Sequence, residues 1–198
     1  MLLDQLKNFK MDENKKIRVF FDLEETLIDD WENCFLYNIS KNENLINHLT
    51  QNNKSVSYEL FSYAVFNSDI DKFNNLRVLL EKVFKIDFST GLLNKKEISN
   101  YFELDRNYLQ VKNKENVMTL DIFKFLYEKD KKVDLKWSNF YKMVDKETMI
   151  KTLYQFKPIQ ELLKEEMWII VDDMVDVKQI CSLDLNIIFL NPKKNKYI

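Results

Sequence analysis

The sequence contains few of the residues on which many catalytic motifs depend. Its 198 residues include one glycine, one histidine, two cysteines and two prolines. Because Gly91 is the only glycine, every glycine-rich phosphate loop is excluded, whether a Walker A loop, a dinucleotide fingerprint or a kinase loop. The only histidine, His48, lies in a segment of helical character (NLINHLTQNN), and we interpret it as a structural or surface residue. We therefore expect any chemistry to rest on carboxylates.

The chain also lacks a charge excess, a long apolar run and a cysteine motif. It carries 30 basic and 32 acidic residues, a balance that argues against electrostatic binding to nucleic acid or membranes. No segment approaches the roughly 20 apolar residues of a membrane span, and the N-terminal MLLDQLKNFKMDENKK is too charged for a signal peptide. Cys34 and Cys181 have no zinc or redox spacing, which favours a reducing compartment. We expect a cytoplasmic protein with no membrane partner.

Hydrophobic residues make up 45% of the chain and aromatic residues 14%, enough for a substantial core. Short apolar runs or alternating patterns predict strands at 17–21, 55–62, 133–137, 167–171 and 186–190. Helical spacing or capping residues predict helices at 44–52, about 70–84, 119–129, 146–155 and 174–182. Strands that alternate with helices indicate an α/β fold, with a Rossmann-like parallel sheet and helices on both faces.

The middle of the chain is the hardest part to interpret. We expect one domain over 1–198, in which residues 87–145 form a mostly helical insertion or cap-like region. The alternative is a helical cap over 31–118. The choice between the two depends on whether Ser62 or Ser138 follows the second strand of the sheet.

Two acidic clusters each follow an apolar strand, in FFDLEETLID (20–29) and WIIVDDMVD (168–176). In an open parallel sheet, ligands bind beyond the carboxyl ends of the strands. If the two strands are neighbours, Asp22 and Glu24 converge with Asp172 and Asp173. Crowded carboxylates repel one another unless a cation compensates, and all-oxygen ligands suit Mg²⁺. The sequence therefore predicts a magnesium site.

The two clusters resemble motifs of the haloacid dehalogenase (HAD) superfamily. FDLEETLID is similar to the first motif, FDLDxTL, and IIVDDMVD is similar to the fourth, in which a strand delivers metal-binding acids. The resemblance implies that Asp22 is a nucleophile and metal ligand, and that Glu24 is the acid/base residue, with a backbone carbonyl that also binds Mg²⁺. Thr26 then fills the hydroxyl position of the motif.

In the fourth motif, the resemblance implies that Asp173 binds the metal, with Asp172 beside it and Asp176 in support. The departure from the family is Glu24, which stands where its hydrolases usually have Asp. The charge is retained, but the side chain is one methylene longer, and a misplacement of about 1 Å can cost roughly 10²-fold in rate.

The second and third motifs are less specific. The second needs a Ser or Thr at a strand end to hydrogen-bond the phosphoryl group, and we favour Ser62 over Ser138. The third supplies a Lys that neutralises the nucleophile and phosphate, and we favour Lys146 over Lys157. The roles of these four residues are expectations that rest on the resemblance and on the predicted strands and helices.

Together these features favour a Mg²⁺-dependent phosphohydrolase that acts on a small phosphomonoester or nucleotide through an aspartyl phosphate. The runner-up is a catalytically degenerate HAD-like domain that binds a protein or nucleic-acid partner, which the glutamate at position 24 would explain. A phosphotransferase or mutase is a third reading that these motifs do not separate from the first.

Overall fold

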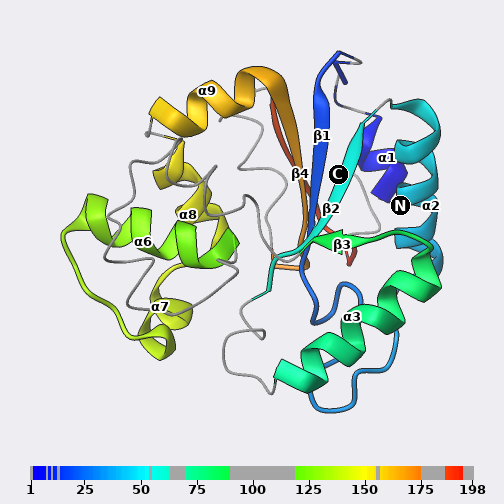
Figure 1. The fold of residues 1–198 in the computed structure, drawn as a ribbon, viewed down its shortest axis with the longest axis horizontal. Helices are drawn as coiled ribbons and strands as arrows, with labels where there is room; N and C mark the ends of the chain where they lie inside the picture. Colours follow the sequence, from blue (N-terminus) through cyan, green and yellow to red (C-terminus); the bar gives the residue numbers. More distant parts are fainter. Residues whose placement is uncertain are drawn as a thin grey trace. The chain divides into compact units, whose positions relative to one another are not determined.

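A computed structural model describes residues 2–7, 9, 11–12, 14–53, 55–62, 70–89, 119–154, 157–174 and 186–193. The chain divides into two compact units (Figure 1). We call Met1–Phe88 with Leu163–Ile198 the sheet unit, and Ser89–Leu162 the helical unit.

The sheet unit contains a sheet of five strands in the order β3-β2-β1-β4-β5. The strands are β1 (Lys16–Phe21), β2 (Val56–Leu60), β3 (Phe88–Ser89), β4 (Glu166–Val171) and β5 (Ile187–Leu190). β1 pairs in parallel with both β2 and β4, and β4 pairs in parallel with β5. The predicted α/β fold with a Rossmann-like parallel sheet is confirmed, as is the adjacency of the two strands that precede the acidic clusters.

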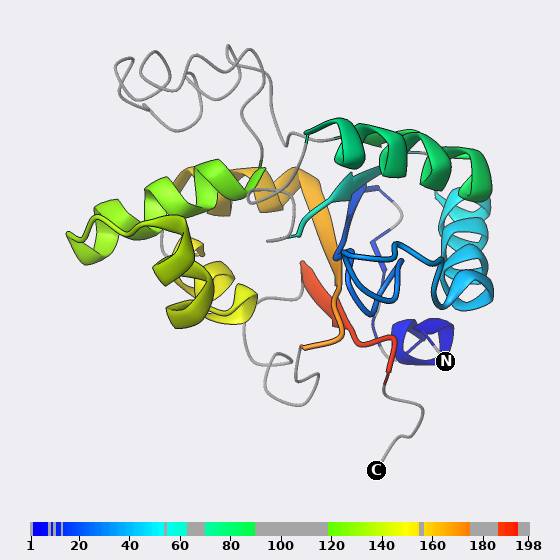
Figure 2. The same ribbon diagram turned by 90° about the horizontal axis from the view of Figure 1, so that it is seen from below.

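Helices α1 (Leu2–Leu6) and α2 (Ile39–Asn52) lie side by side on one face of the sheet (Figures 1 and 2). The Tyr58 hydroxyl of β2 lies 2.7 Å from the Thr50 hydroxyl and donates to the Ile46 carbonyl at 3.2 Å, which ties α2 to that face. Helix α3 (Ile70–Phe84) follows β2 and buries Phe73 and Leu80 on its apolar side. The hydrophobic periodicity from which α2 and α3 are predicted therefore identifies the face that each helix buries.

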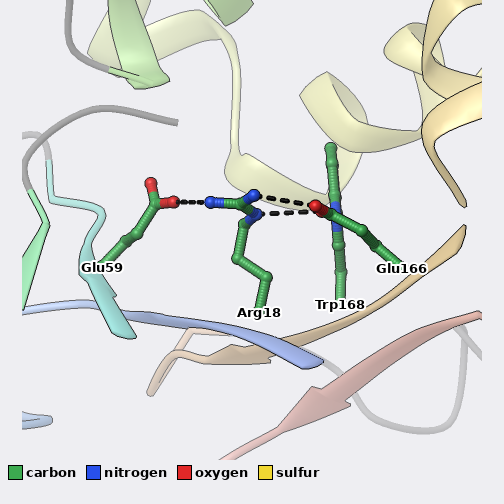
Figure 3. A network of polar contacts seen from close by, with 4 residues as sticks. All are labelled: Arg18, Glu59, Glu166 and Trp168. Atoms are coloured by element: carbon green, nitrogen blue, oxygen red, sulfur yellow. Dashed lines mark hydrogen bonds and ion pairs between the residues drawn. The ribbon is translucent and has the colours of Figure 1, made fainter. Parts of the chain in front are cut away.

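The opposite face of the sheet carries a polar network (Figure 3). Arg18 of β1 donates to both carboxylate oxygens of Glu166 on β4, at 2.8 and 2.9 Å, and to Glu59 on β2 at 2.5 Å. The Trp168 indole donates to Glu166 at 3.1 Å. Burial alone would lower the pKa of Arg18, but the hydrogen bonds and charges of both glutamates outweigh it and raise that pKa. The network joins three adjacent strands.

The helical unit contains α6 (Thr119–Lys131), α7 (Trp137–Met143), α8 (Lys146–Leu153) and most of α9 (Lys157–Glu165), which leads into β4. Helices α6 and α8 pack together. The side chain of Asp145 accepts a hydrogen bond from the Thr148 amide at 2.6 Å, so the predicted N-cap of α8 is confirmed.

One predicted strand is wrong. Residues 133–136 have no regular secondary structure, and Trp137 begins helix α7. Phe140 and Val144, four residues apart, are buried, and the Phe140 ring packs edge-on against Tyr127 with 5.8 Å between centroids. Helical packing after Trp137 thus overrides the short alternating pattern that suggested a strand.

The boundaries of the insertion also differ from the prediction. The helical unit runs from Ser89 to Leu162, beyond the predicted 87–145. Because β2 pairs with β1, the range 31–118 does not form a separate cap. The predicted helix at 174–182 falls almost entirely outside the described residues. Among the described helices, none has the length and apolar character needed to cross a membrane.

Candidate functional site

The two acidic clusters meet at the carboxyl edge of the central strands. The last residues of β1 and β4, Phe21 and Val171, are register partners. The hydrogen-bonded ladder continues one step further, because the Asp22 amide donates to the Val171 carbonyl at 2.9 Å and the Asp172 amide donates to Leu190 of β5 at 3.0 Å. Asp22 and Asp172 therefore leave neighbouring strands at the same level.

Three carboxylates form the candidate site. One carboxylate oxygen from each of Asp22, Asp172 and Asp173 lies within 4.8 Å of the other two. Asp172 is buried, and the other two aspartates are half-buried. Three anionic groups this close repel unless a cation or a proton compensates. An all-oxygen donor set fits Mg²⁺, which usually takes few protein carboxylates and keeps places for water and phosphate.

The carboxylate of Glu24 lies outside this group of three. Glu24 is exposed, and its Oε1 accepts a hydrogen bond from the Trp31 amide at 3.0 Å. Single β-bridges join Ile28 to Glu24 and to Leu36, so the segment after β1 folds back on itself. The Glu24 side chain thus helps to hold the loop that follows the first acidic cluster.

Thr26 is fully buried in the same loop. Its carbonyl accepts a hydrogen bond from the Asn42 side chain of α2 at 2.8 Å, which anchors the loop to the sheet unit. Among the described residues, its hydroxyl has no hydrogen-bond partner. Thr26, which was expected to fill the hydroxyl position of the first motif, therefore lies in the protein interior.

Ser62, which we favour for the second motif, is buried just beyond the end of β2. The Phe61 amide donates to the Phe21 carbonyl at 2.8 Å, so this segment still runs beside β1 where β1 ends. Ser62 and Asp22 thus share one sheet edge. Ser138 is exposed within helix α7 of the helical unit and follows no strand, so the alternative second motif is wrong.

Neither lysine considered for the third motif belongs to the sheet unit. Lys146 is buried at the first residue of α8, and Lys157 is the first residue of α9. That either lysine faces the nucleophile stays a prediction. Asp176, the supporting acid of the fourth motif, lies outside the described residues.

Sequence reasoning missed a different lysine. Lys193, three residues beyond β5, places its Nζ 3.0 Å from Oδ2 of Asp173 and also forms an ion pair with Glu25. The signal was available, because NIIFLNPKK is an apolar strand followed by polar residues, as the two acidic segments are. Applying the strand-end rule to that third strand brings Lys193 to the same edge.

Comparison with protein-family models, curated proteins and solved structures finds no match for the chain.

Proposed function

We propose that this chain is a HAD-like, Mg²⁺-dependent phosphohydrolase, acting in the cytoplasm on a small phosphomonoester or nucleotide. One observation carries the proposal: Asp22 shares a site with Asp172 and Asp173, within 4.8 Å, at the carboxyl ends of adjacent parallel strands. A strand-end carboxylate next to an all-oxygen cation site is what phosphoryl transfer through an aspartyl phosphate requires.

The proposed reaction assigns each step to a named side chain. An oxygen of Asp22 attacks phosphorus while the bond from phosphorus to the leaving oxygen breaks, and Glu24 gives that oxygen a proton. Glu24 then takes a proton from the water that attacks the aspartyl phosphate, which releases phosphate and restores Asp22. Ser62 would hydrogen-bond the phosphoryl group from the end of β2. Mg²⁺ held by Asp22, Asp172 and Asp173 would offset the negative charge of the phosphoryl oxygens.

A groove lies beside the loop that carries Glu24. It has a volume of about 420 Å³ and is lined by Asn33 and Cys34 of the loop and by α3 between Asp71 and Leu79. Lys72, one of its lining residues, places its Nζ 5.2 Å from the centre of the Trp31 ring. The Trp31 amide in turn donates to Glu24. A leaving group in this groove would therefore lie near the proposed acid.

One observation favours the second candidate, a degenerate HAD-like domain that binds a protein or nucleic-acid partner. The Glu24 carboxylate already serves as an acceptor for the Trp31 amide, a structural role that needs no catalysis. An acid that holds a loop can persist after activity is lost. Variants at this position separate the two candidates.

For an active enzyme, Glu24→Gln should lower kcat by about 10²–10⁴-fold, because the amide cannot exchange the transferred proton. The amide oxygen can still accept from Trp31, so the loop is preserved and the loss reports on proton transfer. Glu24→Asp should retain or raise kcat, since it restores the shorter acid of the family. A proficient parent whose kcat is unchanged in Glu24→Gln would show that another group does this work.

The function itself is tested with a panel of phosphomonoesters and nucleotides, assayed with and without Mg²⁺. We expect phosphate release from at least one compound, and its loss when the metal is chelated. A parent that releases no phosphate, together with a Glu24→Asp variant that gains a trace of activity, would favour the degenerate domain. A parent with full activity in excess chelator would contradict the metal site.

A further inference from the structure

The peptide unit between Asp173 and Met174, which we call the site peptide, is held at both of its polar ends. Its N–H donates to Oδ1 of Asp172 at 2.8 Å, and its carbonyl accepts from the Asn191 side chain at 2.7 Å. Because a peptide unit is planar, the two bonds together fix its orientation. The site peptide therefore orients the Asp172 carboxylate and the backbone from which the Asp173 side chain leaves, and both acids belong to the three-carboxylate group.

Asn191 is itself held in place by helix α1. It follows β5, which lies at the edge of the described sheet, where the backbone groups of a strand have no neighbouring strand to bond. The Gln5 side chain of α1 serves as that partner, because it donates to the Asn191 carbonyl at 2.8 Å and accepts from the Asn191 amide at 2.9 Å. Asn191 and Gln5 are only 2% and 8% exposed, so water competes little for these bonds.

The bonds of Gln5 do more than attach α1 to the sheet unit. Leu2 and Leu6 of the same helix are buried and already provide apolar contact. A buried amide adds little to packing and is costly unless both of its polar groups are paired. Here both groups are paired with one residue, Asn191, whose side chain bonds the site peptide. A continuous series of hydrogen bonds thus leads from α1 to the metal-binding acids.

We propose that Asn191 and Gln5 are positioning residues for the metal-binding acids, and that they couple helix α1 to occupation of the metal site. The proposal rests on the Mg²⁺ site of the proposed function. With the site peptide held, Asp172 and Asp173 are preorganised for the cation, so less freedom is lost when it binds. By linkage, a cation that favours this orientation of the site peptide must in turn favour the bonds between Asn191 and Gln5, and so stabilise α1.

The first measurement uses the unmodified protein. Hydrogen–deuterium exchange follows the amides of α1 with and without Mg²⁺, and the Lys7 amide is a direct reporter because it donates to the Leu3 carbonyl at 3.1 Å. We expect saturating Mg²⁺ to slow this exchange by about fivefold, the lower end of the usual coupling between two sites. A helix that only packs against the sheet would not respond to the metal through these bonds.

Two variants test the bonds themselves, with the affinity for Mg²⁺ alone measured by titration calorimetry. Asn191→Leu removes the bond to the site peptide at a similar side-chain volume and should weaken Mg²⁺ binding by about tenfold, the lower end of the effect of outer-shell partners. Gln5→Met removes both bonds from α1 and should weaken it by about threefold, because Asn191 remains but is held less firmly. Both variants should lose the effect of Mg²⁺ on exchange at α1.

The matched control is Asn53→Leu. Asn53 also donates from its side-chain amide to a backbone carbonyl, that of Leu49 at 2.9 Å. It lies between α2 and β2, at the amino end of the parallel strands, away from the three-carboxylate group. Asn53→Leu should therefore keep the parental Mg²⁺ affinity and the effect of Mg²⁺ on α1. Circular dichroism and thermal melts establish that each variant is folded.

Parental Mg²⁺ affinity in folded Asn191→Leu and Gln5→Met would overturn the proposal, as would an equal loss in Asn53→Leu. Exchange at α1 that ignores Mg²⁺ in a parent that binds it would do the same. A parent that binds Mg²⁺ through this series of bonds but hydrolyses no member of the phosphomonoester panel would support the positioning role and defeat the hydrolase function. A Mg²⁺-dependent hydrolase whose metal affinity is unmoved in both variants would defeat the positioning role alone.

Discussion

Asp22→Asn is expected to abolish turnover, with a loss on the order of 10⁵-fold or more, as when the nucleophile of a covalent mechanism is removed. The amide is a poor nucleophile for phosphorus, so no aspartyl phosphate forms. The substitution also removes one negative charge from the three-carboxylate group, so stabilisation of the protein by Mg²⁺ should weaken. Phosphate release and thermal melts with increasing Mg²⁺ measure the two effects separately.

Asp12→Asn is the matched control for this substitution. Asp12 is exposed, precedes β1 instead of following it, and accepts a hydrogen bond from the Asn14 amide at 3.0 Å. The same loss of charge at that end of the sheet should leave turnover and the Mg²⁺ response unchanged. If Asp22→Asn kept a tenth of the parental turnover, covalent catalysis by this residue would be ruled out.

The core of the site could be predicted because it depends on strand ends alone. The runs IRVFF and MWIIV are apolar, rich in β-branched and aromatic residues, and each stops at an aspartate. Both match strands of the sheet, β1 and β4. Parallel neighbours end at a common edge, so Asp22 and Asp172 come together without any detail of side-chain packing.

The cationic part of the site is less well defined by the sequence. With 30 basic residues in the chain, spacing gives each lysine little weight, and Lys146 was favoured for its place at a helix start. That helix start is correct, since α8 begins at Lys146, and the role of this lysine in the site stays a prediction. Lys193 follows the strand β5, so the strand-end rule applies to it as well, and its amide donates to the side chain of Asn191 two residues earlier.

The helical unit was the least predictable part of the fold. Its helices α7 and α9 have 7 and 9 residues, too few for a helical period to stand out clearly. The five residues VDLKW alternate as a strand would, yet they lead into α7. Buried contacts such as that between Tyr127 and Phe140 decide the outcome, and these join residues distant along the chain.

The register that aligns the site depends on the network around Arg18, which lies four residues before Asp22. Arg18 is bonded to both neighbouring strands, through Glu59 and Glu166 (Figure 3). A slip of one residue in β1 would move Arg18 to the other face of the sheet and separate Asp22 from Asp172. The guanidinium therefore favours the single register in which the carboxylates meet.

Arg18→Met is expected to destabilise the protein by about 3–5 kcal/mol, because it leaves two buried carboxylates without their cation. Glu59 is fully buried, and Glu166 is only 5% exposed, so water cannot replace the lost bonds. This loss is a large part of the roughly 5–15 kcal/mol by which a typical domain is stable. Urea unfolding, followed by tryptophan fluorescence and circular dichroism, gives the free energy and its slope.

Two further variants test whether uncompensated buried charge on Glu59 and Glu166 causes this loss of stability. Arg77→Met removes an arginine from a partly exposed i,i+4 pair with Glu81 and should cost no more than about 1 kcal/mol. The triple variant Arg18→Met/Glu59→Gln/Glu166→Gln keeps neutral side chains of similar size and leaves no charge buried at these positions, so it should be more stable than Arg18→Met alone. If the triple variant were less stable than the single one, lost packing and hydrogen bonding, and not uncompensated charge, would account for the role of Arg18.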